Sequence, residues 1–225
     1  MLTVVLQNAN IEIVKTKRGK ELLSSEMVEA RKRANSTEYR PDILHQCLLM
    51  LLDSPLNKAG HLRVLIELSI GKVVTLNKTI RIPRVYSRFS GLLVQLLERH
   101  RIYSEGERIE LMKVEKERLE SFISNESIKV GLSKEGENFF DTLNCDIKAH
   151  AEKQNKEHAH SIEVRSEISE QKEIPEYVFY INAISSGEDP NTGMHHILSL
   201  SAYALSAATC CSKICTYFEE TLNVF

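Results

Sequence analysis

The 225-residue sequence lacks an apolar run long enough to cross a lipid bilayer, and it lacks an excess of positive charge. We therefore expect no membrane partner. Lysine and arginine together number 29 against 31 acidic residues, which gives a formal net charge of -2. This balance excludes a protein coated in positive charge. Any nucleic-acid surface must then be a local patch that makes few phosphate contacts.

Two phosphate-binding motifs are also missing. Neither G-x-x-x-x-G-K-[S/T] nor G-x-G-x-x-G occurs, which argues against a P-loop and against a Rossmann dinucleotide site. The first twenty residues carry Glu12, Lys15, Lys17 and Arg18, so we expect no secretory leader there. No internal repeat is evident. With 42% hydrophobic and 27% charged residues, the chain is long enough to bury a real core as one domain.

The five cysteines are odd in number and irregularly spaced, a pattern typical of free thiols in a reducing compartment. Cys210, Cys211 and Cys215 fall on one expected helix. A structural zinc site needs four well-placed ligands, and no second ligand pair accompanies these three. Buried thiols are therefore the favoured interpretation, with a zinc site as the alternative.

The stretch from residue 81 to 97 joins a basic loop to an apolar helix. Arg81, Arg84 and Arg88 fall close together, and Pro83 favours an extended backbone just before it. Ser90 is the predicted N-cap of the helix, whose leucines would anchor the loop to the core. Arginines on a rigid support suit phosphate, because the planar guanidinium donates two hydrogen bonds to one anion.

Two aromatic residues accompany these arginines, Tyr86 between Arg84 and Arg88 and Phe89 directly after Arg88. Proteins that stack on unpaired bases combine aromatic rings with arginine in this way. The alternative is a solvated loop with both rings tucked into the core. The spacing alone does not decide between the two.

Short apolar runs and helix-period runs alternate along the chain. The helix expected at 43–52 is apolar nearly all round and should be central, with Arg40 and Asp42 at one rim and Asp53 and Lys58 at the other. Further helices are expected at 21–34 and 207–220. The short apolar runs that predict strands are 2–6, 62–68, 72–76, 109–114, 128–132, 177–181 and 197–200.

This alternation predicts an α/β fold with a mostly parallel sheet flanked by helices. In such sheets ligands bind beyond the carboxyl ends of the strands. Three late loops qualify, namely those after Leu132, around Gly187 and at 200–205. Their side chains are small or apolar, so main-chain groups should make most contacts, in a nucleoside-like pocket. The polar segment 144–176 is expected to be a solvated helix or a mobile insert, with metal binding by its histidines, including His158 and His160, as the alternative.

Four segments carry a resemblance to a known family. They are RPDILHQCLL (40–49), LDSPLNKAG (52–60), RIPRVYSRFSGLLVQLL (81–97) and LSAYALSAATCCSK (200–213). Together they resemble the eukaryotic nucleolar Nep/Emg methyltransferases of the SPOUT superfamily, which methylate N1 of a pseudouridine in small-subunit ribosomal RNA. The resemblance covers most of the chain, while 98–127 and 144–176 match poorly.

The resemblance implies a SPOUT-type α/β domain over residues 1–225 with a C-terminal trefoil knot, a β-rich RNA-binding elaboration around 61–88, and the insert at 144–176. It also implies a homodimer, S-adenosylmethionine as cofactor without a metal, small-subunit rRNA and other pre-ribosomal assembly factors as partners, and a nuclear, nucleolar location. The implied RNA contacts are Arg40, Arg81, Arg84 and Arg88, with Asp42 positioning an arginine. The implied cofactor contacts are Leu132, Asn182, Gly187, Glu188, Asp189, Leu200, Ser201, Ala202, Tyr203, Ala204 and Leu205.

Two positions depart from the family pattern. Asn182 stands where the family usually has glycine, and Ala204 where it has proline. The side chain at 182 would either crowd the cofactor or replace a lost contact. Losing a proline costs about 1 kcal/mol or less of backbone entropy. These departures keep open a second function, that of an RNA-binding ribosome-assembly factor with weak or absent methyl transfer.

Methylation at N1 of pseudouridine also requires a proton acceptor, because that nitrogen carries a proton. Asp53, at the rim of the central helix, is the predicted acceptor. The alternatives for this carboxylate are a helix cap and an ion pair with Lys58.

Overall fold

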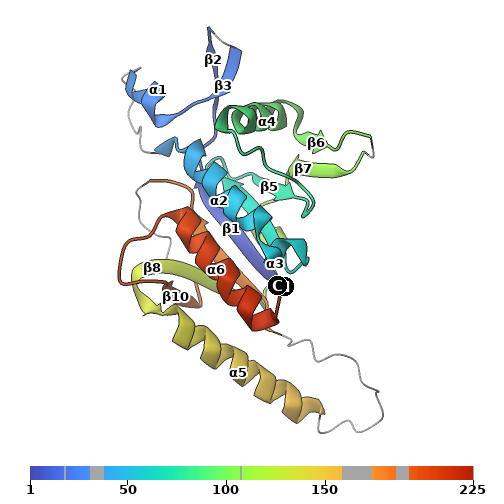
Figure 1. Cartoon of the computed structure of the whole chain (residues 1–225), viewed down its shortest axis with the longest axis vertical. Helices are drawn as coiled ribbons and strands as arrows, with labels where there is room; N and C mark the ends of the chain where they lie inside the picture. Colours follow the sequence, from blue (N-terminus) through green and yellow to red (C-terminus); the bar gives the residue numbers. More distant parts are fainter. Residues whose placement is uncertain (18, 31–37, 107, 159–173, 186–192, 225) are drawn as a thin grey trace.

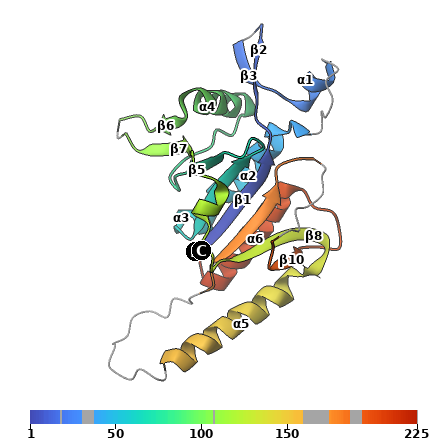
Figure 2. The ribbon, with the colours of Figure 1, turned by 180° about the vertical axis from the view of Figure 1, so that it is seen from behind.

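An eight-stranded mixed sheet forms the centre of the molecule (Figures 1 and 2). The structure is a computed structural model that describes residues 1–225 except 18, 31–37, 107, 159–173, 186–192 and 225. The strands of the sheet are β1 (Leu2–Ala9), β4 (Leu62–Leu68), β5 (Val73–Leu76), β6 (Arg101–Tyr103), β7 (Glu110–Val114), β8 (Ile128–Asn138), β9 (Tyr177–Asn182) and β10 (His196–Ser199). Their order across the sheet is β10-β8-β9-β1-β4-β5-β7-β6.

The first five strands in this order are parallel to one another, and β5, β7 and β6 add to their edge in antiparallel fashion. The predicted α/β fold with a mostly parallel sheet is confirmed. Strands β4 and β5, in the segment predicted to be a β-rich elaboration, are part of this same sheet. An RNA-binding role for that segment stays a prediction.

Strand β1 is central because both of its faces are covered. Val4 and Leu6 enter the main core, while Val5 enters a smaller cluster on the other face with Leu65 and Val178. A strand buried on both faces reads as a continuous apolar run, which is why the sequence predicts it well.

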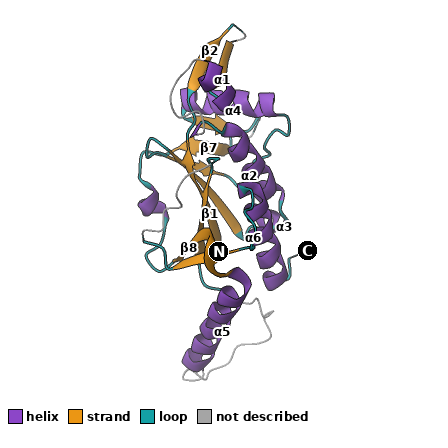
Figure 3. Ribbon diagram, turned by 90° about the vertical axis from the view of Figure 1, so that its left-hand side faces the viewer, coloured by secondary structure: helices purple, strands orange, loops and turns teal. Residues whose placement is uncertain are grey.

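Helices cover the two faces unequally (Figure 3). The helices on the main-core face are α2 (Pro41–Asp53), α3 (Pro55–Lys58) and α6 (Ala207–Leu222), and the short 3-10 helix η2 (Leu119–Phe122) lies on the other face. The remaining elements are α1 (Ser25–Ala30), α4 (Tyr86–Arg99), α5 (Phe139–His158) and a separate hairpin of β2 (Ile13–Thr16) and β3 (Gly19–Leu22). Among the described helices, none has both the length and the apolar character needed to cross a membrane.

Helix α2 begins and ends where its sequence predicts. Pro41 occupies the first turn, where its missing N–H is not needed, and Asp42 follows it. The helix ends at Asp53, and Ser54 then caps α3 by accepting a hydrogen bond from the Asn57 N–H at 3.1 Å. The chain turns back at α3 and enters β4, so α2 runs antiparallel to the parallel strands. Its first residues therefore lie at the carboxyl edge of these strands and Asp53 near the amino edge.

Two local predictions are wrong. Residues 21–34 do not form one helix, because β3 runs to Leu22 and α1 covers only Ser25–Ala30 of the described part. Ser90 is not an N-cap, because α4 begins at Tyr86, with Val85 in the cap position. The Ser90 hydroxyl instead accepts a hydrogen bond from the Leu22 N–H at 3.2 Å, which ties α4 to the hairpin.

The strand predicted at 128–132 is longer than expected. It continues through the expected loop after Leu132 and ends at Asn138. Helix α5 then occupies the start of the polar segment and extends away from the body of the molecule (Figure 1). His158 ends this helix, and His160 lies outside the described residues. The path that would form the predicted knot includes residues 186–192, also outside the described residues, so the knot stays a prediction.

Candidate functional site

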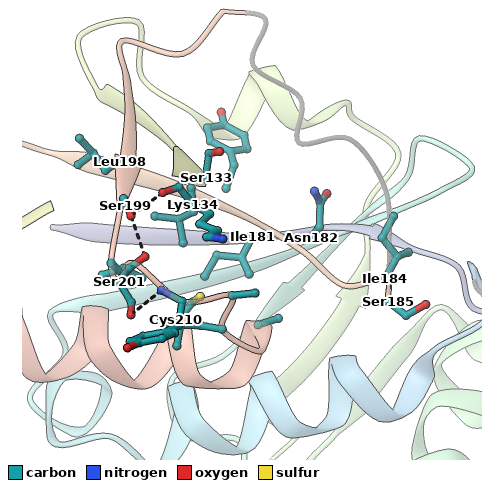
Figure 4. A pocket seen from close by; sticks show the side chains of 17 residues that line it. Ser133, Lys134, Ile181, Asn182, Ile184, Ser185, Leu198, Ser199, Ser201 and Cys210 are labelled. Carbon is teal, nitrogen blue, oxygen red and sulfur yellow. Dashed lines mark hydrogen bonds between the residues drawn. The ribbon is translucent and has the colours of Figure 1, made fainter. Parts of the chain in front are cut away.

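A cavity of about 280 Å³ lies at the carboxyl ends of β9 and β10, between the sheet and the start of α6 (Figure 4). Four segments far apart in the sequence meet there: the middle of β8, the end of β9, the end of β10 with the loop after it, and the first turn of α6. The lining residues are Leu132, Ser133, Lys134, Tyr180, Ile181, Asn182, Ile184, Ser185, Leu198, Ser199, Leu200, Ser201, Tyr203, Ala204, Leu205, Ala207 and Cys210.

A break in the pairing of β8 and β10 shapes one wall. Ile197 pairs with Gly131, but the next residue, Leu198, pairs with Glu137, so β8 bulges out between these points. Gly136 allows the bulge to close, because a Cβ at this position would lie 2.5 Å from the Ile197 carbonyl oxygen. This bulge presents Leu132, Ser133 and Lys134 to the cavity.

Hydroxyl groups tie the bulge to the loop after β10. The Ser199 Oγ lies 3.1 Å from the Lys134 carbonyl oxygen and 3.0 Å from that of Ser201, and it can donate its hydrogen to either (Figure 4). The Ser201 hydroxyl accepts from the Tyr203 N–H at 3.1 Å. Ser206 then caps α6 by accepting from the Thr209 N–H at 3.2 Å. These local bonds give the loop a defined main-chain shape.

Asn182 brings a polar side chain to the lip of the cavity. Its Oδ1 accepts a hydrogen bond of 2.7 Å from the Asn8 Nδ2. Asn8 has a φ of 56° and sits where the register between β1 and β4 shifts. The left-handed conformation suits asparagine, and it aims this side chain at the end of β9. The asparagine that replaces the family's usual glycine at position 182 is thus fixed by a hydrogen bond from Asn8 of β1.

Seven of the predicted cofactor contacts line the cavity: Leu132, Asn182, Leu200, Ser201, Tyr203, Ala204 and Leu205. Ala202 does not line it. Gly187, Glu188 and Asp189 lie outside the described residues. Sequence reasoning missed Lys134, Tyr180 and Cys210, among others. The parallel-sheet rule identifies the ends of β9 and β10, but nothing in the sequence marks the bulge in β8.

The lining is poor in ionisable groups. Among the described lining residues there is no aspartate, glutamate, histidine or arginine, and Lys134 is the one charged side chain. Burial raises the pKa of Tyr180, with smaller contributions from the carboxylates of Glu67 and Glu120. The cavity is therefore suited to binding and aligning a ligand more than to acid–base chemistry.

Arg40 and Asp42 form a two-bond ion pair at the start of α2. Arg40 Nε donates to Asp42 Oδ1 at 2.9 Å, and its terminal nitrogen donates to Oδ2 at 2.7 Å. The hydrogen bonds from Arg40 hold the pKa of Asp42 below its usual value, and those to Asp42 raise the pKa of Arg40. The predicted pairing of Asp42 with an arginine thus exists, although neither residue lines the cavity.

Asp53 lies at the opposite end of α2 and pairs with Arg84 at 2.8 Å. It does not line the cavity. Arg81 and Arg88 are exposed and also lie outside the lining. None of the four predicted RNA-binding arginines therefore lines the cavity.

The two aromatic residues beside these arginines pack inward. Phe89 is fully buried and stacks on His45, with ring centroids 4.4 Å apart. Tyr86 contacts His45 edge-on, and burial raises its pKa to about 12. His45 Nε2 donates to the Pro83 carbonyl oxygen at 2.7 Å. The base-stacking interpretation is wrong for Phe89, and this cluster instead fixes the basic loop onto α2.

Of the three thiols predicted to be buried, Cys211 and Cys215 are buried, whereas Cys210 is only half-buried. Cys47, Cys211 and Cys215 are buried where α2 packs against α6. The neighbouring Cys47 thiol and burial raise the pKa of Cys211, and burial raises that of Cys215 to about 12. In the described part of the chain, no three histidine, cysteine or acidic side chains come together as a metal site would require.

Comparison with known proteins gives one consistent result. The profile of the EMG1/NEP1 methyltransferase family matches residues 4–219. The ribosomal RNA small subunit methyltransferase NEP1 of Drosophila melanogaster is 36% identical over 99% of this chain and 83% of its own length. The Homo sapiens protein of the same name is 34% identical over 99% and 82%. The crystal structure of Archaeoglobus fulgidus Nep1 bound to S-adenosylhomocysteine superposes with a TM-score of 0.70 at 20% identity, covering 97% of each chain.

Proposed function

This chain belongs to the EMG1/NEP1 methyltransferase family, and we propose that it methylates N1 of a pseudouridine in small-subunit ribosomal RNA, with S-adenosylmethionine as methyl donor. The observation that carries the proposal is the cavity at the carboxyl ends of β9 and β10, in a chain that matches the family over residues 4–219. The match to relatives named as rRNA small subunit methyltransferases supports the RNA substrate class.

The residues present fit the proposed cofactor. Leu132, Ile181 and Leu198 supply apolar walls of the kind that enclose an adenine ring. The loop at 200–205 supplies main-chain donors and acceptors in a shape held by Ser199 and Ser201. Gly187, Glu188 and Asp189 are proposed as further contacts on the strength of the family resemblance.

In the proposed reaction the protein acts mainly by aligning the methyl group with the attacking nitrogen. S-adenosylmethionine supplies an electrophilic methyl group on a sulfonium. The rigid walls from β8, β9 and the loop after β10 would hold that group in line with the attacking nitrogen, which removes much of the entropic cost of reaction. Among the described lining residues there is no carboxylate or imidazole to accept the N1 proton. We propose that this proton leaves to water at the mouth of the cavity, and that Glu188 and Asp189 contact only the cofactor.

Asp53 has a different proposed task. It lies at the far end of α2 from the cavity and pairs with Arg84, so it can approach a bound base only from a second subunit. We propose that Asp53 orients Arg84 for a phosphate. Arg40, Arg81 and Arg88 are proposed as the other RNA contacts, with Asp42 aiming Arg40. A homodimer that brings this surface to the cavity, pre-ribosomal assembly factors as partners and a nucleolar location complete the proposal.

Calorimetry with S-adenosylhomocysteine tests the cofactor site without turnover. We expect saturable binding with a stoichiometry of about one per chain, since each chain carries its own cavity. Absence of any heat at millimolar ligand would contradict the proposal.

A second candidate function is RNA binding in ribosome assembly without methyl transfer. The observation that favours it is the Asn182 side chain at the lip of the cavity, held by Asn8. This candidate predicts rRNA binding with no measurable affinity for S-adenosylhomocysteine. The calorimetric experiment therefore separates the two functions.

A further inference from the structure

Lys134 is the one charged side chain among the described residues that line the cavity. Figure 4 shows it among the side chains that line the cavity, and it is exposed to solvent. In the described part of the chain, no carboxylate comes within ion-pair distance of its ammonium group. An exposed cation at the wall of a cavity whose described lining holds no acidic side chain is a site for an anionic group of a ligand.

The main chain that carries Lys134 is fixed on two sides. Its carbonyl oxygen accepts a hydrogen bond from the Ser199 hydroxyl at 3.1 Å. Two residues later, Gly136 lies so close to β10 that any Cβ would collide with the Ile197 main chain. The bulge therefore presents this side chain from a rigid support, and only the flexible stem of the lysine remains to be ordered when a ligand binds.

We propose that Lys134 binds the α-carboxylate of the methionine part of the methyl donor, an inference that rests on the proposed function. S-adenosylmethionine carries one anionic group, the carboxylate, and two cationic groups, the ammonium and the sulfonium. Lys134 attracts the first and repels the other two. It thus turns the amino-acid end of the donor toward the β8 bulge and keeps the sulfonium away from it. Lys134 is a ligand-positioning residue that acts on the end of the donor remote from the methyl group.

Isothermal titration of the full chain with two ligands tests this assignment. S-adenosylhomocysteine carries the carboxylate, whereas 5′-methylthioadenosine has the same adenosine and sulfur but no amino-acid end. We expect Lys134→Met to lower the affinity for S-adenosylhomocysteine by about fivefold, which is the upper range for an ion pair open to solvent. The affinity for 5′-methylthioadenosine should change by less than about twofold, because this ligand offers nothing for the ammonium to bind.

Two further variants serve as controls. Lys134→Arg keeps the charge and should retain most of the affinity for S-adenosylhomocysteine. Lys148→Met removes an exposed lysine of α5 that does not line the cavity. This variant should bind both ligands with unchanged affinity. Raising the salt concentration should weaken S-adenosylhomocysteine binding by the unaltered chain more than by Lys134→Met, because the ion pair is screened.

Each other outcome overturns the assignment. If Lys134→Met weakens both ligands equally, the lysine supports the shape of the cavity and not the carboxylate. If it weakens neither ligand but lowers RNA affinity, Lys134 binds a phosphate of the substrate. If the unaltered chain binds neither ligand, the proposed function itself fails. If that chain binds both and the lysine variant is indistinguishable from it, only the role of Lys134 fails.

Discussion

The ion pair at the start of α2 is the best-defined electrostatic contact at the scale of single residues. Arg40 holds the pKa of Asp42 below its usual value, so the pair stabilises the fold above the ordinary carboxyl pKa of about 4 and stops doing so as the pH falls through the lowered value. We expect Asp42→Asn to reduce the free energy of unfolding by no more than about 1 kcal/mol at pH 7, because both side chains are partly exposed.

Denaturant titrations at pH 7 and pH 3 check this expectation. The stability difference between the two chains should be smaller at pH 3, because below the ordinary carboxyl pKa the unfolded chain binds a proton that the paired carboxylate resists. Glu152→Gln, on the exposed part of α5, is the matched control and should show little difference at either pH. A difference that stays constant from pH 7 to pH 3 would contradict the electrostatic explanation.

Asn182 offers a second test on a single side chain. Asn182→Gly removes the hydrogen bond to Asn8 and adds backbone freedom at the end of β9, so we expect a loss of about 1–2 kcal/mol in the free energy of unfolding. The affinity for S-adenosylhomocysteine should not fall, because the rest of the lining is unchanged. A clear fall in affinity, measured by calorimetry, would show instead that the amide contacts the ligand.

At the scale of elements, the bulge in β8 depends on a glycine. Gly136→Ala would place a Cβ 2.5 Å from the Ile197 carbonyl oxygen, and a main-chain atom can move away only if β10 shifts. We expect this change to lower the free energy of unfolding by about 1–3 kcal/mol. It should also lower the affinity for S-adenosylhomocysteine, because β10 and the bulge form two walls of the cavity.

Gly91→Ala is the matched control for this substitution. Gly91 lies in α4, and an added Cβ there meets nothing within 4 Å. Alanine should therefore stabilise the protein by about 0.5–1 kcal/mol and leave ligand binding unchanged. Equal effects of the two alanine substitutions in thermal unfolding would refute the role assigned to the bulge.

The reactivity of the five thiols tests how α2, α5 and α6 bury their side chains. A maleimide should label the exposed Cys145 first and the half-buried Cys210 more slowly, while Cys47, Cys211 and Cys215 should react only after unfolding. Because Cys210 lines the cavity, S-adenosylhomocysteine should slow its labelling without affecting Cys145. Peptide mass spectrometry measures both rates in one sample. Labelling of Cys210 that is indifferent to the ligand would place the ligand elsewhere.

Strong, continuous patterns made some elements predictable from the sequence. β1 is buried along most of its length, α2 is apolar nearly all round although Met50 is exposed, and β9 and α6 have clear strand and helix patterns between turn residues. Tertiary contacts decided the rest. The sequence predicts that the Ser90 hydroxyl caps a helix, but it accepts a hydrogen bond from the Leu22 N–H of β3. The sequence does not predict β3, because this strand is short and polar.

The cavity was predictable in outline for a general reason. Parallel strands bring their carboxyl ends to one edge, so the loops after β9 and β10 were expected to meet. The contribution of β8 was predicted only at Leu132. Lys134 was missed because a bulge depends on the register with β10, and a single sequence does not encode that register visibly.

At the scale of the whole molecule, the predicted RNA-binding arginines lie outside the lining of the cavity. We expect Arg84→Ala to weaken rRNA binding and to reduce the slope of log affinity against log salt by about one phosphate contact. Asp53→Asn keeps the guanidinium but removes the ion pair that orients it, so RNA binding should weaken less than in Arg84→Ala. Methyl transfer by Asp53→Asn should also drop far less than the hundredfold or more expected from removing a general base, as single-turnover assays would reveal.

Methyl transfer to a defined RNA tests the central claim most directly. The full chain is incubated with S-adenosylmethionine and a small-subunit rRNA fragment that contains one pseudouridine, and the digested nucleosides are identified by mass spectrometry. The proposed function predicts N1-methylpseudouridine in this fragment and no methylated nucleoside in the same fragment with uridine at that position. RNA that binds the protein but stays unmethylated, or a methyl group on any other nucleoside, would contradict it.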